Sequence, residues 1–343
     1  ALVKENVYPD PRIGLNNYLI PDVSDEFNAR MDLSKYNYLK SGRNPWQDPY
    51  WYRTEVVLPK SYKGKKVWLT LNGINYRADV WVNGRQVADK KDIVGMFRRF
   101  KLDITGYARA GANNCIAIKI YQVDHPGVPT PGTQLKVFGP VRGHSYDIFK
   151  DETLKISGGW DCAPVVRDRN MGIYQKVIVE ATDEVLIENP FVITTLPKST
   201  TMPMKVDTGL AKVNIKLEVR NTSAKLVEGK VNAWITLLNE VKFPTYTKHM
   251  EGYLKPIKLT KKVALRAGER KVVELTPEDF PSLLIENPYL WYPNGYGEQY
   301  LHHMKLSFSI GGKVSDTKEF DFGIREVASG LTGWEMNVVV YIM

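Results

Sequence analysis

The segment from Val67 to Tyr121 carries the strongest structural pattern in this sequence, because its apolar residues recur at every second position. The alternation is clearest in two runs, Val67–Leu71 and Ile116–Ile120. A period of two is typical of a β-strand with one buried face. Between these runs, Asn83-Gly84 supplies two residues that tolerate positive φ, which favours a tight hairpin turn. The segment therefore predicts antiparallel strands.

The second half of the chain repeats this pattern, and no long segment shows the periodicity of a helix. Predicted strands there cover Val213–Val219, Val231–Leu237, Lys271–Leu275, Leu301–Ile310 and Ser315–Phe322, with Gly311-Gly312 as the turn between the last two. Short strands separated by turn residues predict an all-β chain built of sandwiches. The stretch Ile187–Thr201, which contains Pro190 and Pro197, is interpreted as the entry to a second domain.

Two groups of residues resemble glycoside hydrolase family 2. In the first half, they match the run G-x-x-Y-x-A-x-V-W-x-N-G of the family's N-terminal sugar-binding domain, followed by aromatic residues and Asp-Ile-Thr: Gly73, Tyr76, Ala78, Val80, Trp81, Asn83, Gly84, Phe97, Phe100, Asp103, Ile104 and Thr105. In the second half, residues 287–297 (NPYLWYPNGYG) and 322–326 (FGIRE) are close to two further family motifs.

This resemblance implies a fold and a division into domains. We expect a jelly-roll galactose-binding-like sandwich over residues 1–186 and an immunoglobulin-like β-sandwich over residues 187–327. Residues 328–343 would then begin a linker to a TIM-barrel catalytic domain, which is absent from this sequence. A TIM barrel takes roughly 250 residues of alternating strands and helices, and the sequence contains no such alternation.

A fourth motif concerns the sugar site. Residues 158–164 (GGWDCAP) and 169–174 (RNMGIY) are similar to signatures of the mannosidase-like and exo-glucosaminidase-like branch of the family. The resemblance implies that Trp160 and Asp161 bind the terminal sugar. A carboxylate accepts charge-assisted hydrogen bonds from hydroxyl or ammonium groups, and an indole offers a flat apolar face. The alternative for both residues is local: Trp160 packs on its own domain and Asp161 caps a turn.

The sequence gives no catalytic residues. Asn239-Glu240 repeats the dipeptide that carries the acid/base in the family's barrel, but a retaining glycosidase needs two carboxyl groups about 5–5.5 Å apart, and no second carboxylate fits that partnership. Whether this chain is an enzyme is therefore left uncertain; the parent protein is expected to be a glycoside hydrolase, and the chain itself is expected to be inactive.

The charge and the apolar content of the sequence limit the classes of partner that the chain is expected to bind. The net charge of +9 is spread along the chain without a nucleic-acid-binding motif, and no stretch reaches the apolar length of a membrane helix. We therefore expect carbohydrate as the partner, bound together with the catalytic domain, and neither nucleic acid nor membrane. We expect no cofactor and no metal. The sequence leaves the compartment open, although a periplasmic or secreted location is favoured if the source is bacterial.

Two classes of function follow from these patterns. The first is the non-catalytic N-terminal part of an exo-acting retaining β-glycosidase, with an exo-β-D-glucosaminidase-like parent preferred and a β-mannosidase-type parent as the alternative. The second is a stand-alone carbohydrate-binding protein of two sandwiches, because a fold by itself does not fix a function.

Overall fold

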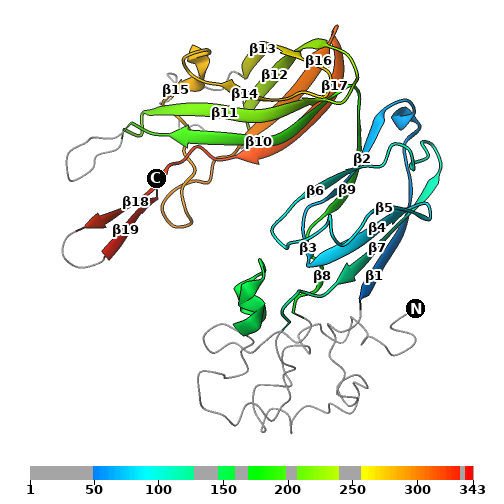
Figure 1. Cartoon of the computed structure of the whole chain (residues 1–343). Helices are drawn as coiled ribbons and strands as arrows, with labels where there is room; N and C mark the ends of the chain where they lie inside the picture. Colours follow the sequence, from blue (N-terminus) through cyan, green and yellow to red (C-terminus); the bar gives the residue numbers. More distant parts are fainter. Residues whose placement is uncertain are drawn as a thin grey trace, which may run out of the picture. The chain divides into compact units, whose positions relative to one another are not determined.

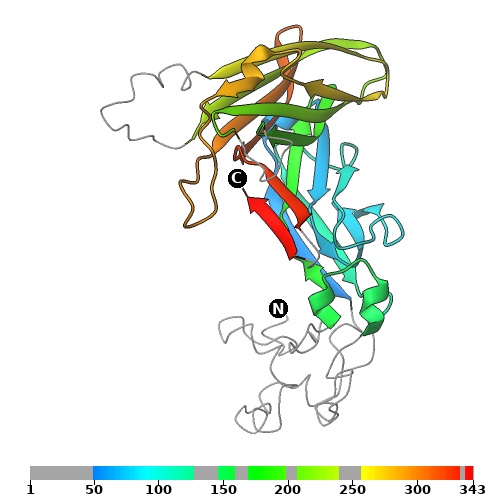
Figure 2. The ribbon, with the colours of Figure 1, turned by 90° about the vertical axis from the view of Figure 1, so that its left-hand side faces the viewer.

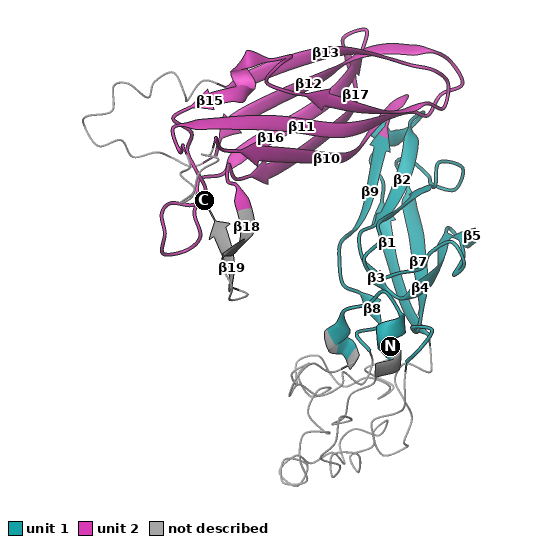
Figure 3. Cartoon of the chain, turned by 60° about the vertical axis from the view of Figure 1, so that its left-hand side comes forward, with its two compact units in different colours: residues 1–181 teal, residues 182–343 magenta. Residues whose placement is uncertain are grey.

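The computed structural model describes residues 49–126, 146–158, 169–197, 207–238, 256–332 and 337–342. The chain divides into two compact units, residues 1–181 and 182–343 (Figure 3). In the described residues, regular structure is β-strand apart from a few short 3₁₀ helices. The prediction of an all-β chain is therefore confirmed. No helix in these ranges is long and apolar enough to cross a membrane.

In its described residues, the first unit has three sheets, in the orders β1-β7-β4-β5, β6-β2-β9 and β3-β8 (Figure 1). Its elements are β1 (Tyr50–Val57), η5 (Lys60–Tyr62), β2 (Lys66–Leu71), β3 (Ile74–Asn75), β4 (Arg77–Val82), β5 (Arg85–Ala88), β6 (Phe100–Asp103), β7 (Asn113–Tyr121), η7 (Tyr146–Lys150), η8 (Lys155–Gly158), β8 (Gly172–Ile173) and β9 (Val177–Thr182).

The core of the first unit lies between the two larger sheets. Alternate residues of β4, β7 and β2 face it and are buried: Ala78, Val80, Val82, Ile116, Ile118, Ile120, Val67, Leu69 and Leu71. The alternation seen in the sequence thus selects the inward face. Trp68 points to the opposite face of β2 from Val67 and Leu69, and it is nevertheless buried, with only 2% of its surface exposed. Strand β2 is therefore covered on both faces at this residue.

The hairpin between β4 and β5 forms as the sequence predicts. Asn83 and Gly84 have φ values of 51° and 81°, and Val82 pairs with Arg85. Positive φ at both central residues is the geometry of the tight turn that joins twisted antiparallel strands. The Asn83 side chain also accepts a hydrogen bond from the backbone N–H of Cys115 at 3.0 Å. The asparagine therefore fixes both the turn and its position against β7.

In the described residues, the second unit has two sheets of four strands each, in the orders β10-β11-β14, with β15 paired to β11, and β13-β12-β16-β17. Figure 2 shows these strands from a second side, in colours that run from green to orange. A further pair, β18-β19, follows them. Its elements are β10 (Val185–Thr195), β11 (Leu210–Asn221), β12 (Val227–Leu237), β13 (Ile257–Leu265), β14 (Arg270–Leu275), η10 (Pro281–Leu283), β15 (Leu284–Glu286), β16 (His302–Ile310), β17 (Lys313–Phe322), β18 (Val327–Thr332) and β19 (Asn337–Ile342).

One core fills the space between the two four-stranded sheets. Strands β11 and β12 contribute alternate residues from opposite sheets, among them Val213, Ile215, Leu217, Val219, Val231, Ala233 and Ile235. Strand β16 adds Met304, Leu306 and Phe308. Two sheets that pack face to face through such alternating residues form a β-sandwich, in agreement with the immunoglobulin-like sandwich expected for this half of the chain.

Strand β10 has two different halves. Its first half is tied to β17, because the backbone N–H groups of Val185 and Ile187 donate to Ser315 Oγ at 2.8 Å and Asp316 Oδ2 at 2.7 Å. The pairing of β10 with β11 then shifts register between Glu188 and Phe191. A bulge of this kind accommodates Pro190, which has no N–H to donate. The strand therefore continues through the proline to Thr195.

Candidate functional site

The sugar-binding residues predicted from the sequence, Trp160 and Asp161, lie outside the described residues. So do Asn239 and Glu240. The structure does describe the chain on both sides of residues 159–168, and these two flanks show how the predicted motif is attached to the first sandwich.

The two flanks meet directly. The side-chain Nδ2 of Asn170 donates a hydrogen bond to Ser157 Oγ at 2.7 Å. Arg169 and Asn170 both have positive φ, 57° and 53°. Asparagine is among the residues that reach this region most readily, whereas arginine adopts it less often. The segment between residues 158 and 169 therefore starts and ends at one hydrogen-bonded point.

A buried asparagine joins this point to the sandwich. Asn75, on β3, is fully buried, and its Nδ2 donates to the carbonyl oxygens of Arg169 at 2.8 Å and Asn170 at 3.1 Å. The backbones also pair, because Asn75 lies opposite Gly172 in the β3-β8 sheet. Most buried polar groups in proteins are hydrogen-bonded, so these two bonds from Nδ2 favour this position of residues 169–172.

Arg169 is the most unusual residue of this group, because its side chain is 0% exposed. Its Nε donates to the carbonyl oxygen of Pro126 at 2.7 Å. A buried guanidinium is stabilised only when its donors are paired. The sequence analysis assigned no role to Arg169 or Asn75. The resemblance of residues 169–174 to a family signature was the feature of the sequence that indicated this part of the first unit.

Tyr174 closes the same region on the other side of β8. Its hydroxyl donates to the carbonyl oxygen of Met96 at 2.5 Å, and its ring packs on Gly73. A Cβ added at Gly73 would lie 2.5 Å from the ring carbon Cζ of Tyr174. The glycine that begins the first family motif is thus required for a close side-chain approach.

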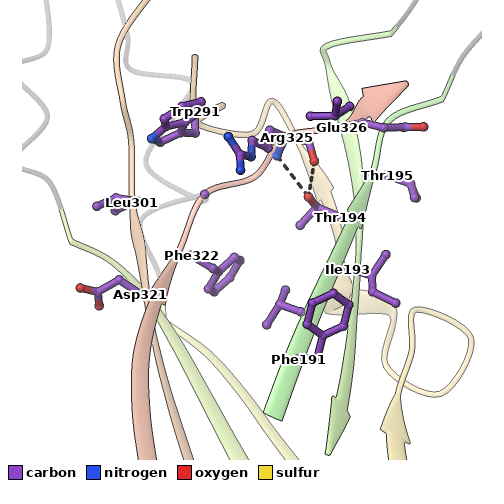
Figure 4. Close-up of a pocket in the computed structure, with 13 residues that line it drawn as sticks. Phe191, Ile193, Thr194, Thr195, Trp291, Leu301, Asp321, Phe322, Arg325 and Glu326 are labelled. Carbon is purple, nitrogen blue, oxygen red and sulfur yellow. Dashed lines mark hydrogen bonds between the residues drawn. The ribbon is translucent and has the colours of Figure 1, made fainter. Parts of the chain in front are cut away.

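The second unit carries an open groove of about 840 Å³, shown in Figure 4. Two of the sequence motifs meet there, because Trp291 comes from residues 287–297 and Phe322, Gly323 and Arg325 come from residues 322–326. The second half of β10 forms the opposite wall. The groove and the predicted sugar-binding residues belong to different units.

Contacts between the two motifs hold one wall of the groove. The guanidinium carbon of Arg325 lies 4.5 Å from the centroid of the Trp291 ring. The backbone N–H of Trp291 donates to the carbonyl of Ile324 at 2.9 Å. A Cβ at Gly323 would lie 2.6 Å from Cβ of Trp291, so this position needs glycine for packing. The two motifs therefore act as one structural element.

Hydrogen bonds connect this wall to β10. Thr194 Oγ1 donates to the carbonyl of Arg325 and accepts from its backbone N–H, as the dashed lines in Figure 4 mark. The backbone N–H of Leu196 donates to Glu326 Oε2 at 2.7 Å. These bonds fix the groove on both sides.

The groove is open and partly apolar. Phe191 and Ile193 of β10 are 59% and 42% exposed, and Val327 is 54% exposed. Exposed apolar side chains that gather at a concave surface are typical of an interaction site. The arrangement suits the docking of another protein surface, and the sequence did not reveal it because its residues come from three separate segments.

Metal binding is not indicated by this part of the structure. In the described ranges, no three His, Cys, Asp or Glu side chains are placed to hold a metal ion together. His302 and His303, which are neighbours in sequence, lie on opposite faces of β16: His302 is 3% exposed, whereas the side chain of His303 is 33% exposed.

The fold defines a module of two β-sandwiches. Residues 32–175 match the glycosyl hydrolase 2 galactose-binding domain-like model, and residues 187–325 match the model for glycosyl hydrolases family 2. The chain belongs to glycosyl hydrolase family 2.

Similar proteins include several glucosaminidases. The chain is 30% identical over 286 residues to an exo-beta-D-glucosaminidase of Amycolatopsis orientalis, covering 82% of this chain and 22% of that protein. It is 27% identical to a mannosylglycoprotein endo-beta-mannosidase of Lilium longiflorum, covering 96% of this chain and 30% of that protein. The chain thus spans less than a third of the length of these relatives.

Solved structures agree with this placement. A crystal structure of the exo-chitosanase CsxA of Amycolatopsis orientalis has a TM-score of 0.60 and 27% identity, covering 89% of this chain and 30% of that one. A complex of a CsxA variant with PNP-beta-D-glucosamine has a TM-score of 0.63 and 26% identity, covering 99% of this chain and 30% of that one.

Proposed function

We propose that this chain is the non-catalytic N-terminal part of an exo-acting, retaining β-glycosidase of the exo-β-D-glucosaminidase type. In this proposal the second sandwich supports a catalytic barrel, and the first sandwich contributes residues to the terminal-sugar subsite. The observation that carries the proposal is the convergence of two family motifs on one exposed groove, because motifs that only stabilised a sandwich would have no need of an open apolar surface.

The groove provides the means to hold a catalytic domain. Phe191 and Ile193 offer apolar area, and Arg325, stacked on Trp291, offers a guanidinium held in one orientation. Apolar contacts and a pre-positioned arginine are enriched at the centres of protein interfaces. The groove wall is internally hydrogen-bonded, so docking costs little reorganisation.

The contribution to the sugar subsite is assigned to Trp160 and Asp161. Support comes from the flanks of their segment, which Ser157, Asn170 and Asn75 connect to the sandwich. A binding site needs support from hydrogen bonds and packing around it, and the two flanks have such support. Asp161 would accept a hydrogen bond from a sugar hydroxyl or from the ammonium group of glucosamine.

A β-mannosidase-type parent is the second candidate, favoured by the endo-beta-mannosidase relative that covers 96% of this chain. The two parents differ at C2 of the sugar, where glucosamine carries an ammonium group and mannose an axial hydroxyl. Assays of the full-length protein with nitrophenyl β-D-glucosaminide and nitrophenyl β-D-mannoside distinguish them. We expect kcat/KM to be higher for the glucosaminide.

The role of Asp161 is tested in the full-length protein by Asp161→Ala, with Asp183→Ala as a control outside the motif. A charged hydrogen bond is worth about 1.5–3 kcal/mol, so kcat/KM should fall by roughly ten- to a hundredfold. Unchanged thermal stability would accompany that loss. Wild-type kcat/KM in Asp161→Ala would leave the turn-capping alternative, and the recognition role would be wrong.

A further inference from the structure

A pair of tryptophans stands on the outer face of the β1-β7-β4-β5 sheet, whose strands are labelled in Figure 3. Trp51 of β1 and Trp81 of β4 have ring centroids 5.1 Å apart and an interplanar angle of 32°. Trp51 is 53% exposed and Trp81 is half-buried. Neither belongs to the core cluster of the first unit, so core packing does not explain them.

The register of the sheet explains how the rings meet. Trp51 pairs with Lys119 of β7, whereas Trp81 pairs with Ala117, two residues away on the same strand. The two tryptophans are therefore diagonal neighbours across the middle strand, at a distance that long aromatic side chains can span. Ala117 is small, so the indoles can close over it, and at this separation and tilt they form an offset-stacked pair that presents a single apolar platform.

Polar groups surround this tryptophan pair and are already partnered within the face. Lys119 Nζ lies 5.4 Å from the Trp51 ring centroid and 5.0 Å from that of Tyr121. Asp79 accepts the Tyr121 hydroxyl at 2.6 Å and the backbone N–H of Lys90 at 2.8 Å. Positively and negatively charged groups therefore lie next to one another around the indoles. This polar rim can offer hydrogen bonds to a ligand without creating a strong electrostatic potential of one sign.

We propose that this face binds a β-1,4-linked pyranose oligosaccharide, with a sugar ring lying on the apolar platform formed by the stacked indoles of Trp51 and Trp81. A pyranose has an apolar C–H face that matches an indole, and equatorial hydroxyls at its edge that match the polar rim. A binding surface for a protein buries about 800 Å² on each partner, much more than two indoles offer. A nucleic acid requires a basic surface, which the paired carboxylates Asp79 and Glu55 oppose.

This site goes beyond the proposed function, because it needs neither Asp161 nor a catalytic domain. Its role would be to hold a polymeric substrate near the enzyme and raise its effective concentration. The tryptophan pair contacts the flat faces of the sugar rings and not the substituent at C2. Oligomers of glucose and of glucosamine should therefore bind with affinities within a few-fold of each other.

The test uses the 343-residue chain and two probes, the β-1,4-linked hexamers of glucose and of glucosamine, titrated by calorimetry and by tryptophan fluorescence. We expect dissociation constants of about 1 mM or below. Trp51→Ala and Trp81→Ala should each weaken binding at least about tenfold, while Trp51→Phe should retain most of it because a flat ring remains. Far-ultraviolet circular dichroism verifies that each variant is folded.

Trp234 supplies a matched control. It is 43% exposed on β12 of the second unit, and Lys258 Nζ lies 4.4 Å from its ring centroid, but it is not stacked on another aromatic ring among the described residues. Trp234→Ala should leave the dissociation constants for both hexamers unchanged. Equal losses in Trp234→Ala and Trp51→Ala, no binding of either hexamer, or wild-type binding by the Trp51→Ala/Trp81→Ala double variant would each overturn the proposal.

In the full-length protein the two proposals give different results. Loss of the tryptophan pair should lower the rate on a polymeric substrate and leave hydrolysis of a nitrophenyl monosaccharide unchanged. A failure of the proposed glycosidase function would remove both rates and leave hexamer binding by this chain intact. Loss of the nitrophenyl rate in Trp51→Ala would instead place the pair in the catalytic machinery, against the present proposal.

Discussion

Acid should destabilise the second sandwich through one buried histidine. His302, on β16, is 3% exposed and its ring stacks on Phe322 with centroids 5.4 Å apart. Burial in this apolar setting lowers the pKa of His302 from 6.5 to about 4, because the charged imidazolium loses its hydration. The folded protein therefore keeps His302 neutral at pH values where the unfolded chain has already protonated it.

The sign and size of the effect follow from this difference in pKa. Between pH 6.5 and pH 4 the unfolded state binds one proton more than the folded state, so stability falls as the pH falls. Each pH unit in that window is worth about 1.4 kcal/mol. At pH 5 the loss attributable to His302 should be about 2 kcal/mol relative to pH 7.5, a large part of the stability of a domain.

Urea unfolding at pH 7.5 and pH 5 measures this loss. His302→Gln removes the titrating group, so its free energy of unfolding should depend less on pH than that of the wild type by about 2 kcal/mol over this interval. Any constant cost of the substitution cancels in the comparison. Identical pH dependence in the wild type and His302→Gln would refute the reasoning.

Three further predictions concern the motifs. Gly323→Ala should displace Trp291 and lower stability by about 1–3 kcal/mol in thermal unfolding, whereas Gly106→Ala, which meets no atom within 4 Å, should be nearly neutral. Asn170→Gly retains the positive φ but loses the bond to Ser157, so limited proteolysis between residues 158 and 169 should accelerate while the rest of the chain resists. The 343-residue chain alone should release no nitrophenol from nitrophenyl β-D-glucosaminide above a buffer blank; release abolished by a substitution within the chain would contradict this.

Sequence patterns predicted the fold well where one face of a strand is uniformly apolar. Ile116–Ile120 and Val213–Val219 became central strands, and Asn83-Gly84 became the turn that its φ tolerance suggests. Strand β13 was missed for a physical reason. Lys261 occupies an inward-facing position in it and interrupts the apolar period, because its Nζ reaches the carbonyl of Glu274 at 2.8 Å instead of packing in the core.

The candidate sites were less accessible to sequence reasoning. The motif residues Trp291, Gly323 and Arg325 were recognised one stretch at a time, but the groove exists only because β10 lies across from them. Likewise, Trp51 and Trp81 are 30 positions apart, and only the strand register makes them neighbours. Trp160 and Asp161 remain predictions from resemblance, because the structure describes the flanks of their segment and not the residues themselves.

The bulge in β10 has a consequence for how this protein can change over evolutionary time. Residues before Asn189 are committed to joining two sheets, so substitutions there put the whole sandwich at risk. Beyond the bulge, Phe191 and Ile193 are exposed, whereas Val192 between them packs against the core. Within a few residues, this strand thus passes from positions where substitutions endanger the fold to positions where the fold tolerates them. Enzymes built on this module could exchange the surface they present to a neighbour while inheriting the same fold.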